Sequence, residues 1–306
     1  MKKFLKTAVV FGLVCAICYP LFLFVWGVSM PEFLKLNLNY RIASYGHMFS
    51  RIEEVKTTRD VDILFLGSSH AYRGIDTRIF TTNGFKVFNL GSSSQTPIQT
   101  KILVERYLEQ LNPKLVLLEV YPSIFTNDGV ESSLDIIAND KNDIRSLKMA
   151  WQIHHIKTYN ALLYGSMRDA MHLNDNITEP IHHGSDTYIS GGFVEKEMAF
   201  YTPQKRSAYG FNPRAYQLKA FESLLAFFDK KDIDVLLVFA PITSGLYESF
   251  EAKEEFDSLM HSYGNYINFN KHIQLNDSLH FYDPHHLNQN GVELFNKKLL
   301  EFIPKM

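Results

Sequence analysis

Cysteine is almost absent from this chain of 306 residues, and its scarcity excludes two kinds of architecture. The two cysteines, Cys15 and Cys18, both lie in the first apolar stretch. No disulfide framework can therefore hold the rest of the chain, and a metal site built from thiolates is excluded. An excess of one charge is also absent, since 31 Lys and Arg stand against 33 Asp and Glu. Because no basic stripe occurs outside the extreme N-terminus, nucleic acid is not expected as a partner.

Long apolar runs are absent after the N-terminus, which leaves one candidate for a membrane span. Lys2, Lys3 and Lys6 precede an apolar run over residues 7–28, and no acidic residue occurs before Glu32. The run makes about 33 Å of helix, which is enough to cross a bilayer. The lysines then stay on the cytoplasmic side, so we expect a single-pass protein of the cytoplasmic membrane with its domain facing the periplasm or the cell exterior. A cleaved signal peptide and a buried core helix are the alternatives.

Beyond a connecting segment at 31–59, buried strands alternate with helices. Strands that are apolar on both faces are typical of a parallel sheet covered by helices on each side. Such strands are expected at 61–67, 85–91, 114–122 and 234–242, with a further candidate at 265–270. Helices are expected at 97–111, 213–231 and 291–303. This alternation predicts a doubly wound α/β fold.

The segment at about 123–212 interrupts the alternation. Residues 151–172 are expected to be helical, and a polar, glycine-rich stretch follows them. We interpret the segment as an insertion over the active-site end of the sheet. It belongs to an α/β domain over 60–306 that follows the anchor at 1–30. A separately folding domain is the alternative.

Serines follow the first expected strand at the edge of the sheet where α/β proteins bind ligands. A serine becomes a useful nucleophile when a base lies in hydrogen-bond reach and the base has an orienting partner. Asp283 and His286 are three residues apart, so both side chains can project to the same side of one turn. Asn288 can cap the helix that follows. Ser69, His286 and Asp283 are therefore a chemically sufficient set. Ser68 is the alternative nucleophile, and a capping role is the alternative for Ser69.

The residues of this set stand in sequence blocks that resemble those of the SGNH/GDSL hydrolase superfamily: FLGSSHAY, FNLGSSSQT and DPHHLN. The resemblance implies a flavodoxin-like three-layer α/β/α sandwich, with Ser69 as nucleophile and Asp283 and His286 as its partners. It also implies an oxyanion hole formed by the N–H groups of Ser69 and Gly91. It implies no cofactor and no metal.

The chain departs from the pattern of the superfamily at two places. Ser68 stands where the family usually has Asp, and EVYPS stands where a third block usually supplies an Asn to the oxyanion hole. The oxyanion hole can then rest on backbone donors, with help from Asn89 or Ser92.

Several other residues are candidates for contact with a ligand. Substrate-binding candidates near the expected site are His70, Arg73, Asn89 and Tyr121. Solvated turn positions and core packing are the alternatives for them. Aromatic candidates for a sugar groove are Trp151, Tyr159 and Tyr164, although aromatic residues at helical spacing are more often core. The histidine pairs at 154–155, 182–183 and 285–286 suggest a metal site, but adjacent side chains point differently, so none is expected.

The anchor, its expected orientation and the GSSH turn together look most like the membrane-tethered branch of the superfamily. Proteins of that branch work with membrane-bound O-acyltransferases in cell-envelope acylation, as in alginate O-acetylation or teichoic-acid D-alanylation. The resemblance implies that the serine passes an acyl group to a polysaccharide hydroxyl, with a membrane-bound O-acyltransferase as a partner. A carbohydrate esterase of the same fold is one alternative. A catalytically silent glycan-binding or scaffold partner of the acyltransferase is another.

Overall fold

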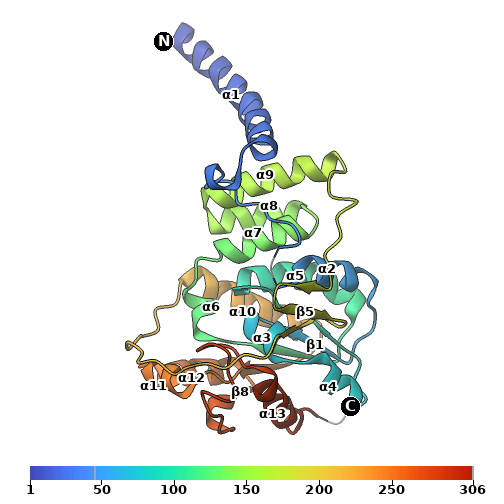
Figure 1. The fold of residues 1–306 in the computed structure, drawn as a ribbon. Coiled ribbons are helices and arrows are strands. Elements are labelled where there is room, and N and C mark those ends of the chain that lie inside the picture. Colours follow the sequence, from blue (N-terminus) through green and yellow to red (C-terminus); the bar gives the residue numbers. More distant parts are fainter. Residues whose placement is uncertain (45, 305–306) are drawn as a thin grey trace.

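A parallel sheet forms the centre of the domain (Figure 1). The computed structural model describes residues 1–44 and 46–304. The sheet has five strands in the order β2-β1-β3-β7-β8, and every neighbouring pair is parallel. Its strands are β1 Ile63–Leu66, β2 Val87–Asn89, β3 Leu115–Glu119, β7 Asp234–Phe239 and β8 Tyr266–Asn268. Each lies inside one of the strands expected from the sequence, so the doubly wound α/β fold is confirmed.

Helices cover both faces of the sheet. Successive strand residues point to opposite sides, and because both sets are apolar, each face must be buried. Leu64 and its equivalents on the other strands pack on one helical layer, and Phe65 and its equivalents pack on the other. The first layer contains α2 Met48–Thr57, α5 Pro97–Leu111, α10 Ala215–Asp229 and α12 Lys253–Tyr263. The second contains α4 Thr77–Thr82 and α13 Gln289–Leu300. Shorter helices are α3 Ser69–Gly74 and α11 Ser244–Ser249. The result is a three-layer α/β/α sandwich.

Part of the expected connecting segment belongs to the domain. Residues 48–57 form α2, and Met48, Ile52 and Val55 of this helix are buried in the core. Their spacing is helical, but charged residues between them hide the pattern.

Most of the N-terminal helix α1, Lys2–Ser29, extends away from the domain (Figure 1). Leu23 and Gly27 are its buried residues, and both lie near its C-terminal end. Within the described part of the chain, α1 is the one helix that is long and apolar enough to cross a membrane. Length and composition fit a membrane anchor or a signal sequence equally.

The middle segment forms helices followed by a small antiparallel sheet. Its helices are α6 Pro122–Thr126, α7 Val130–Asn139, α8 Ile144–Ile153 and α9 Ile156–Ala170. Its strands are β4 His182–His183, β5 Asp186–Ile189 and β6 Phe193–Lys196. The helix expected over 151–172 is broken at its start, because His154 adopts a left-handed backbone conformation, with φ 50°, between α8 and α9.

The middle segment shares the core of the α/β domain. Ile136, Ile137 and Met149 are fully buried in the same cluster as the strand residues of the main sheet. A loop of the small sheet also covers the edge strand β2, since the Asn89 N–H donates to the Gly191 carbonyl at 2.7 Å. The segment therefore does not have the separate core of an independent domain.

Candidate active site

The first strand ends in a turn that requires glycine. Gly67 has φ +141°, and a Cβ atom there would lie 2.6 Å from Cβ of Glu119. Ser68 follows as the N-cap of α3, and its side chain accepts a hydrogen bond from the His70 N–H. Ser69 is the first residue of α3. The turn thus uses Ser68 as the cap and leaves the Ser69 hydroxyl free to meet a partner.

That partner is His286, which lies 217 positions later in the sequence. Its Nε2 lies 2.8 Å from Oγ of Ser69, and its Nδ1 lies 2.8 Å from Oδ2 of Asp283. The three side chains form a continuous hydrogen-bonded chain. This is the geometry in which an imidazole takes a proton from a serine hydroxyl while a carboxylate holds the tautomer.

The loop before α13 holds the imidazole in place. Oδ1 of Asp283 accepts the N–H groups of His285 and His286 at 2.7 and 2.8 Å. The His286 ring stacks on Tyr282, with a centroid distance of 5.5 Å and an interplanar angle of 7°. Asn288 caps α13 by accepting the Gly291 N–H. The loop is therefore fixed at both ends, which limits the entropy lost on reaching a reactive geometry.

Asp283 stays ionised at neutral pH. Burial raises its pKa, but the hydrogen bond from His286, the charge of that ring and the two backbone N–H groups outweigh burial and bring the pKa to about 2. An ionised carboxylate can both orient the imidazole and stabilise the imidazolium that forms when His286 takes a proton.

Ser68 is committed to a structural role, which argues against it as the nucleophile. It is buried, and both its N–H and its hydroxyl donate to Oε2 of Glu119 at 2.8 Å. Glu119 ends β3 and is completely buried beneath the turn. Burial raises the pKa of Glu119 to about 7, against the effect of the two Ser68 donors. Glu119 is thus a buried support for the nucleophile turn.

Glu119 makes a testable contribution to stability. The folded state keeps its proton up to about pH 7, whereas an unperturbed Glu has a pKa of 4.5. Because the folded state binds more protons in this interval, the free energy of unfolding falls as the pH rises from about 4.5 to about 7, by about 3 kcal/mol. Glu119→Gln does not titrate, so its stability relative to wild type should increase over the same interval.

The measurement is thermal and urea unfolding of the full chain in detergent at pH 4.5, 6 and 8. Glu109→Gln, which removes an exposed carboxylate on α5, is the matched control for loss of a negative charge. If Glu119→Gln and Glu109→Gln differ from wild type by the same amount at every pH, the buried titration assigned to Glu119 is wrong.

The resemblance implied that the Gly91 N–H forms part of the oxyanion hole, but in the structure this amide already has a partner. A Cβ atom at Gly91 would lie 3.0 Å from the Gly67 carbonyl, so glycine is needed for this close approach. Its N–H donates to Oδ1 of Asn89 at 3.2 Å. Asn89 is fully buried, and its amide group donates to the Ala71 and Ile75 carbonyls. Asn89 therefore ties β2 to α3 and is a structural residue rather than a ligand for substrate.

Ser92 also faces inward. It is buried, its N–H donates to the Gly67 carbonyl and its hydroxyl donates to Gln95. A different side chain, Asn127, lines the cavity at the triad. Its Nδ2 group forms no hydrogen bond with any residue that the structure describes, so this donor is available to a developing oxyanion. Asn127 directly follows α6, eight residues after the end of β3. Nothing in the sequence indicated that this residue would reach the cavity.

The cavity at the triad is small. It measures about 160 Å³, which suits a short acyl group better than a long chain. It is lined by Ser68, Ser69, His70, Ser94, Tyr121, Ser123, Ile124, Asn127, His285 and His286. Three of these, Ser123, Ile124 and Asn127, come from the start of the middle segment, which therefore reaches the site through α6.

Two of the substrate-binding candidates line this cavity. His70 is buried between Tyr121, at a ring distance of 4.3 Å, and His286, at 5.1 Å. Burial first, then the charges of His286 and His285, holds the pKa of His70 well below its usual value, so its ring is neutral. The Tyr121 hydroxyl lies 3.1 Å from Nδ1 of His285. His70 and Tyr121 thus form a neutral aromatic wall beside the base.

Arg73, the remaining substrate-binding candidate, is paired with a carboxylate of the protein. Its two terminal nitrogens bind both carboxylate oxygens of Asp186 at 2.9 and 2.7 Å. This bidentate pair is mostly buried and ties α3 to β5 of the small sheet. The sequence could not show this, because Asp186 lies in a polar stretch with no strong strand pattern.

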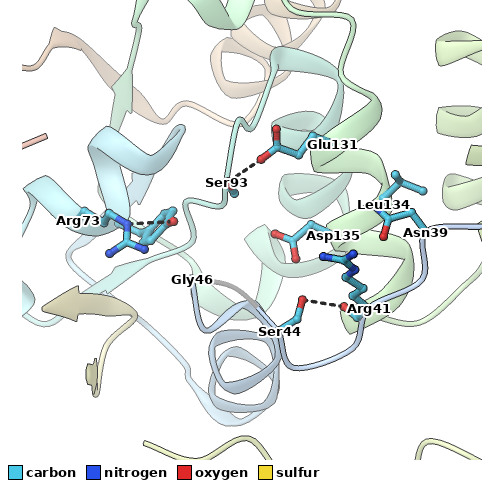
Figure 2. Close-up of a pocket in the computed structure, with 10 residues that line it drawn as sticks. Asn39, Arg41, Ser44, Gly46, Arg73, Ser93, Glu131, Leu134 and Asp135 are labelled. Carbon is cyan, nitrogen blue, oxygen red and sulfur yellow. Dashed lines mark hydrogen bonds between the residues drawn. The ribbon is translucent and has the colours of Figure 1, made fainter. Parts of the chain in front are cut away.

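A second, larger hollow adjoins α3 through Tyr72 and Arg73 (Figure 2). It measures about 280 Å³ and is lined by Asn39, Arg41, Ser44, Gly46, Tyr72, Arg73, Ser93, Glu131, Leu134 and Asp135. Ser93, which donates to Glu131 at 2.9 Å, precedes Ser94 of the triad cavity. Burial raises the pKa of Asp135 to about 7, despite the nearby charge of Arg51. The hollow is thus lined by hydroxyl, carboxyl and guanidinium groups, several of which are paired with each other or with neighbouring residues.

The histidine pairs do not gather at one place, and neither do the aromatic candidates. Among the described residues, no three His, Cys, Asp or Glu side chains lie close enough to hold a metal ion. The pairs at 154–155 and 182–183 bond to neighbouring residues of their own segments. Trp151 is exposed on α8, whereas Tyr164 is buried against α1. The aromatic candidates therefore do not form one groove at the triad.

Comparisons with known proteins identify no family for this chain. No protein-family model matches the chain, and no curated protein matches it. Among solved structures, it is similar to a putative acylhydrolase from Bacteroides fragilis, with 11% identity over 84% of this chain and 96% of that chain, and a TM-score of 0.41. It is also similar to a GDSL-like lipase from Bacteroides thetaiotaomicron, with 13% identity over 85% and 97%, and the same TM-score of 0.41. A gut microbial diltiazem-metabolizing enzyme matches at 10% identity over 80% and 47%, with a TM-score of 0.30.

Proposed function

We propose that this chain is a membrane-anchored serine O-acyltransferase that acts outside the cytoplasm on a cell-envelope polysaccharide. One observation carries the proposal: Ser69, His286 and Asp283 form a hydrogen-bonded chain with both contacts of the imidazole at 2.8 Å. A serine with this base and this orienting group can form an acyl-enzyme.

The first half-reaction loads the serine. His286 Nε2 takes the hydroxyl proton while Ser69 Oγ attacks the carbonyl carbon of an acyl donor. The Ser69 N–H and the side-chain amide of Asn127 stabilise the oxyanion. The tetrahedral intermediate collapses, the bond to the leaving group breaks, and His286 returns the proton to that group. The product is an acyl ester on Ser69, and Asp283 remains ionised throughout.

The second half-reaction transfers the acyl group. His286 takes a proton from a sugar hydroxyl, the sugar oxygen attacks the acyl carbonyl, and the bond to Ser69 Oγ breaks as the serine regains its proton. Two features favour a sugar over water as the acceptor. The hollow in Figure 2 offers polar groups next to α3, and α1 would hold the site near the envelope. A membrane-bound O-acyltransferase is the proposed acyl source.

A carbohydrate esterase is the second candidate, because water can replace the sugar in the same half-reaction. The side chain of Asp283 is 36% exposed and that of His286 is 19% exposed, so solvent reaches the triad. A catalytically silent scaffold is the third candidate, and the intact hydrogen-bonded chain argues against it.

The experiment that separates these functions uses the full chain in detergent with a chromogenic acetyl ester, a serine-directed covalent probe and an oligosaccharide acceptor. We expect the probe to label Ser69 and the acceptor to gain acetyl groups faster than the ester is hydrolysed. Hydrolysis that the acceptor does not divert would replace transferase by esterase. Failure of the probe to label Ser69 would favour the scaffold.

A further inference from the structure

The end of α1 is packed firmly against α9. Gly27 touches the ring of Tyr164 so closely that an added Cβ would lie 2.3 Å from it. Leu23 is buried in the same cluster. About one turn before Leu23, the Tyr19 hydroxyl donates to Oδ1 of Asn160 at 2.6 Å. The last turns of α1 therefore lie directly on α9, with no flexible stalk between the helix and the domain.

The length of α1 determines where α9 sits relative to a bilayer. If Lys6 marks the cytoplasmic boundary, the apolar helix begins at Thr7. Gly27 follows Thr7 by 20 positions, which is about 30 Å of helix and equals the thickness of the hydrocarbon core. Gly27 then lies at the outer boundary of the core, beside Tyr164. Asn160, whose partner Tyr19 lies about 12 Å nearer the cytoplasm, reaches from α9 past this boundary. The contact that fixes α1 thus brings α9 to the lipid.

The neighbouring helix α8 carries an apolar face that no other described part of the chain covers. Ile144, Leu147 and Trp151 recur at helical spacing and are 61%, 50% and 72% exposed. Met149 is on the opposite face and is completely buried. Exposed apolar side chains gathered on one helix face mark an interaction surface.

Two further groups extend this apolar surface near the end of α1. Ile156, at the start of α9, is 50% exposed. In the segment after α1, Phe33 and Leu36 are each 73% exposed. Lys148, on α8, is also exposed and could meet lipid phosphates. An amphipathic helix with Trp and Lys of this kind is typical of a segment that lies in the membrane interface.

We infer that α8 and the start of α9 lie in the headgroup layer of the outer leaflet, with Ile144, Leu147 and Trp151 facing the lipid. The domain is then docked on the membrane surface rather than suspended above it. The inference rests on the proposed role of α1 as a membrane span, which brings α9, the partner of α8, to the outer boundary (Figure 1).

The chain has two tryptophans, one in α1 and one in α8, so the depth of each helix can be measured separately. Trp26 is near the end of α1, and Trp151 is on α8. Trp26→Phe leaves Trp151 as the single reporter, and Trp151→Phe leaves Trp26. Each full-length variant is reconstituted into phosphatidylcholine–phosphatidylglycerol vesicles whose chains are brominated either near the carbonyl or near the methyl end. We expect both tryptophans to be quenched to a similar extent, and more strongly by bromine near the carbonyl.

The outcomes separate the inference from the anchor on which it rests. Quenching of Trp26 but not of Trp151, with Trp151 open to iodide in water, overturns the inference and leaves the span in place. In that case the apolar face of α8 is free for a protein partner. Failure to quench either residue overturns the span and the inference together.

A second set of variants tests the face itself. In the Trp26→Phe background, Leu147→Glu should reduce the quenching of Trp151 by lipid. Leu294→Glu is the matched control, because Leu294 is an exposed leucine on α13, at the end of the molecule opposite α1 (Figure 1). The same two substitutions in the Trp151→Phe background should leave the quenching of Trp26 unchanged. Equal quenching of Trp151 in both glutamate variants contradicts the proposed docking face.

Discussion

Ser69→Ala should remove the acyl-transfer and esterase activities almost completely while the chain stays folded. Ser69 Oγ has its hydrogen bond with His286, so its loss leaves no buried polar group of the core without a partner. We expect activity to fall roughly 10⁴- to 10⁶-fold, the range seen when a nucleophile is removed from a serine triad. Covalent labelling of the protein by a serine-directed probe should disappear as well.

The neighbouring serine provides the matched control. Ser68→Ala deletes the N-cap of α3 and one of the two hydrogen bonds to Glu119, so it should lower stability by about 1 kcal/mol or more. It leaves the Ser69 hydroxyl in place, and labelling should persist at temperatures where the variant is folded. If Ser68→Ala abolishes labelling while Ser69→Ala retains it, the two serines have been assigned the wrong way round. Mass spectrometry of the labelled peptide identifies the residue directly.

Asp283→Asn should have the second largest effect, because it changes the tautomer of His286 rather than the position of its ring. Asp283 now accepts a hydrogen bond from His286 Nδ1, which leaves Nε2 as the acceptor for the Ser69 proton. An asparagine amide can donate to Nδ1 instead, and Nε2 would then carry the hydrogen and could not act as a base. We expect kcat to fall on the order of 10³- to 10⁴-fold, with little change in KM.

The loop itself should survive this substitution. Asn can still accept the N–H groups of His285 and His286 that Asp283 Oδ1 accepts now. Asp283→Ala loses those bonds too and should show a lower melting temperature in addition to the loss of activity. A variant Asp283→Asn with kcat near that of wild type would show that the carboxylate does not orient the base. Steady-state kinetics, together with circular dichroism melts, distinguishes these results.

The sheet was predictable from the sequence because its strands are apolar on both faces. Each of the five strands falls within an expected segment, and α5, Pro97–Leu111, matches its expected range. The small sheet β4–β6 was not predictable. Its strands are short, β4 is exposed and β5 is only partly buried, so they lack the alternation that reveals a half-buried strand. The break between α8 and α9 was not predicted, because a histidine at position 154 does not by itself indicate a left-handed backbone.

The set Ser69, His286 and Asp283 could be proposed from the sequence because each member stands in a recognisable local pattern. Asp283 and His286 share one loop, and Ser69 follows a recognisable strand and glycine. The support of the site was less visible. Glu119 could have been noticed as a carboxylate at the end of a fully apolar strand, because such a group must find a buried donor. Asn127 gave no such signal, and the partner of Arg73 lies 113 positions away.

The loop of the small sheet that covers β2 has a consequence for how this protein can vary. Gly192 approaches β2 so closely that a Cβ atom would lie 2.0 Å from the Asn89 carbonyl oxygen, and the Gly192 carbonyl accepts a hydrogen bond from the buried Arg51. The same sheet holds α3 through Asp186 and Arg73. A shortened relative without this loop would expose an open sheet edge to other chains and release the helix that begins at the nucleophile. The middle segment, which the sequence presents as an insertion, is therefore structurally coupled to Ser69.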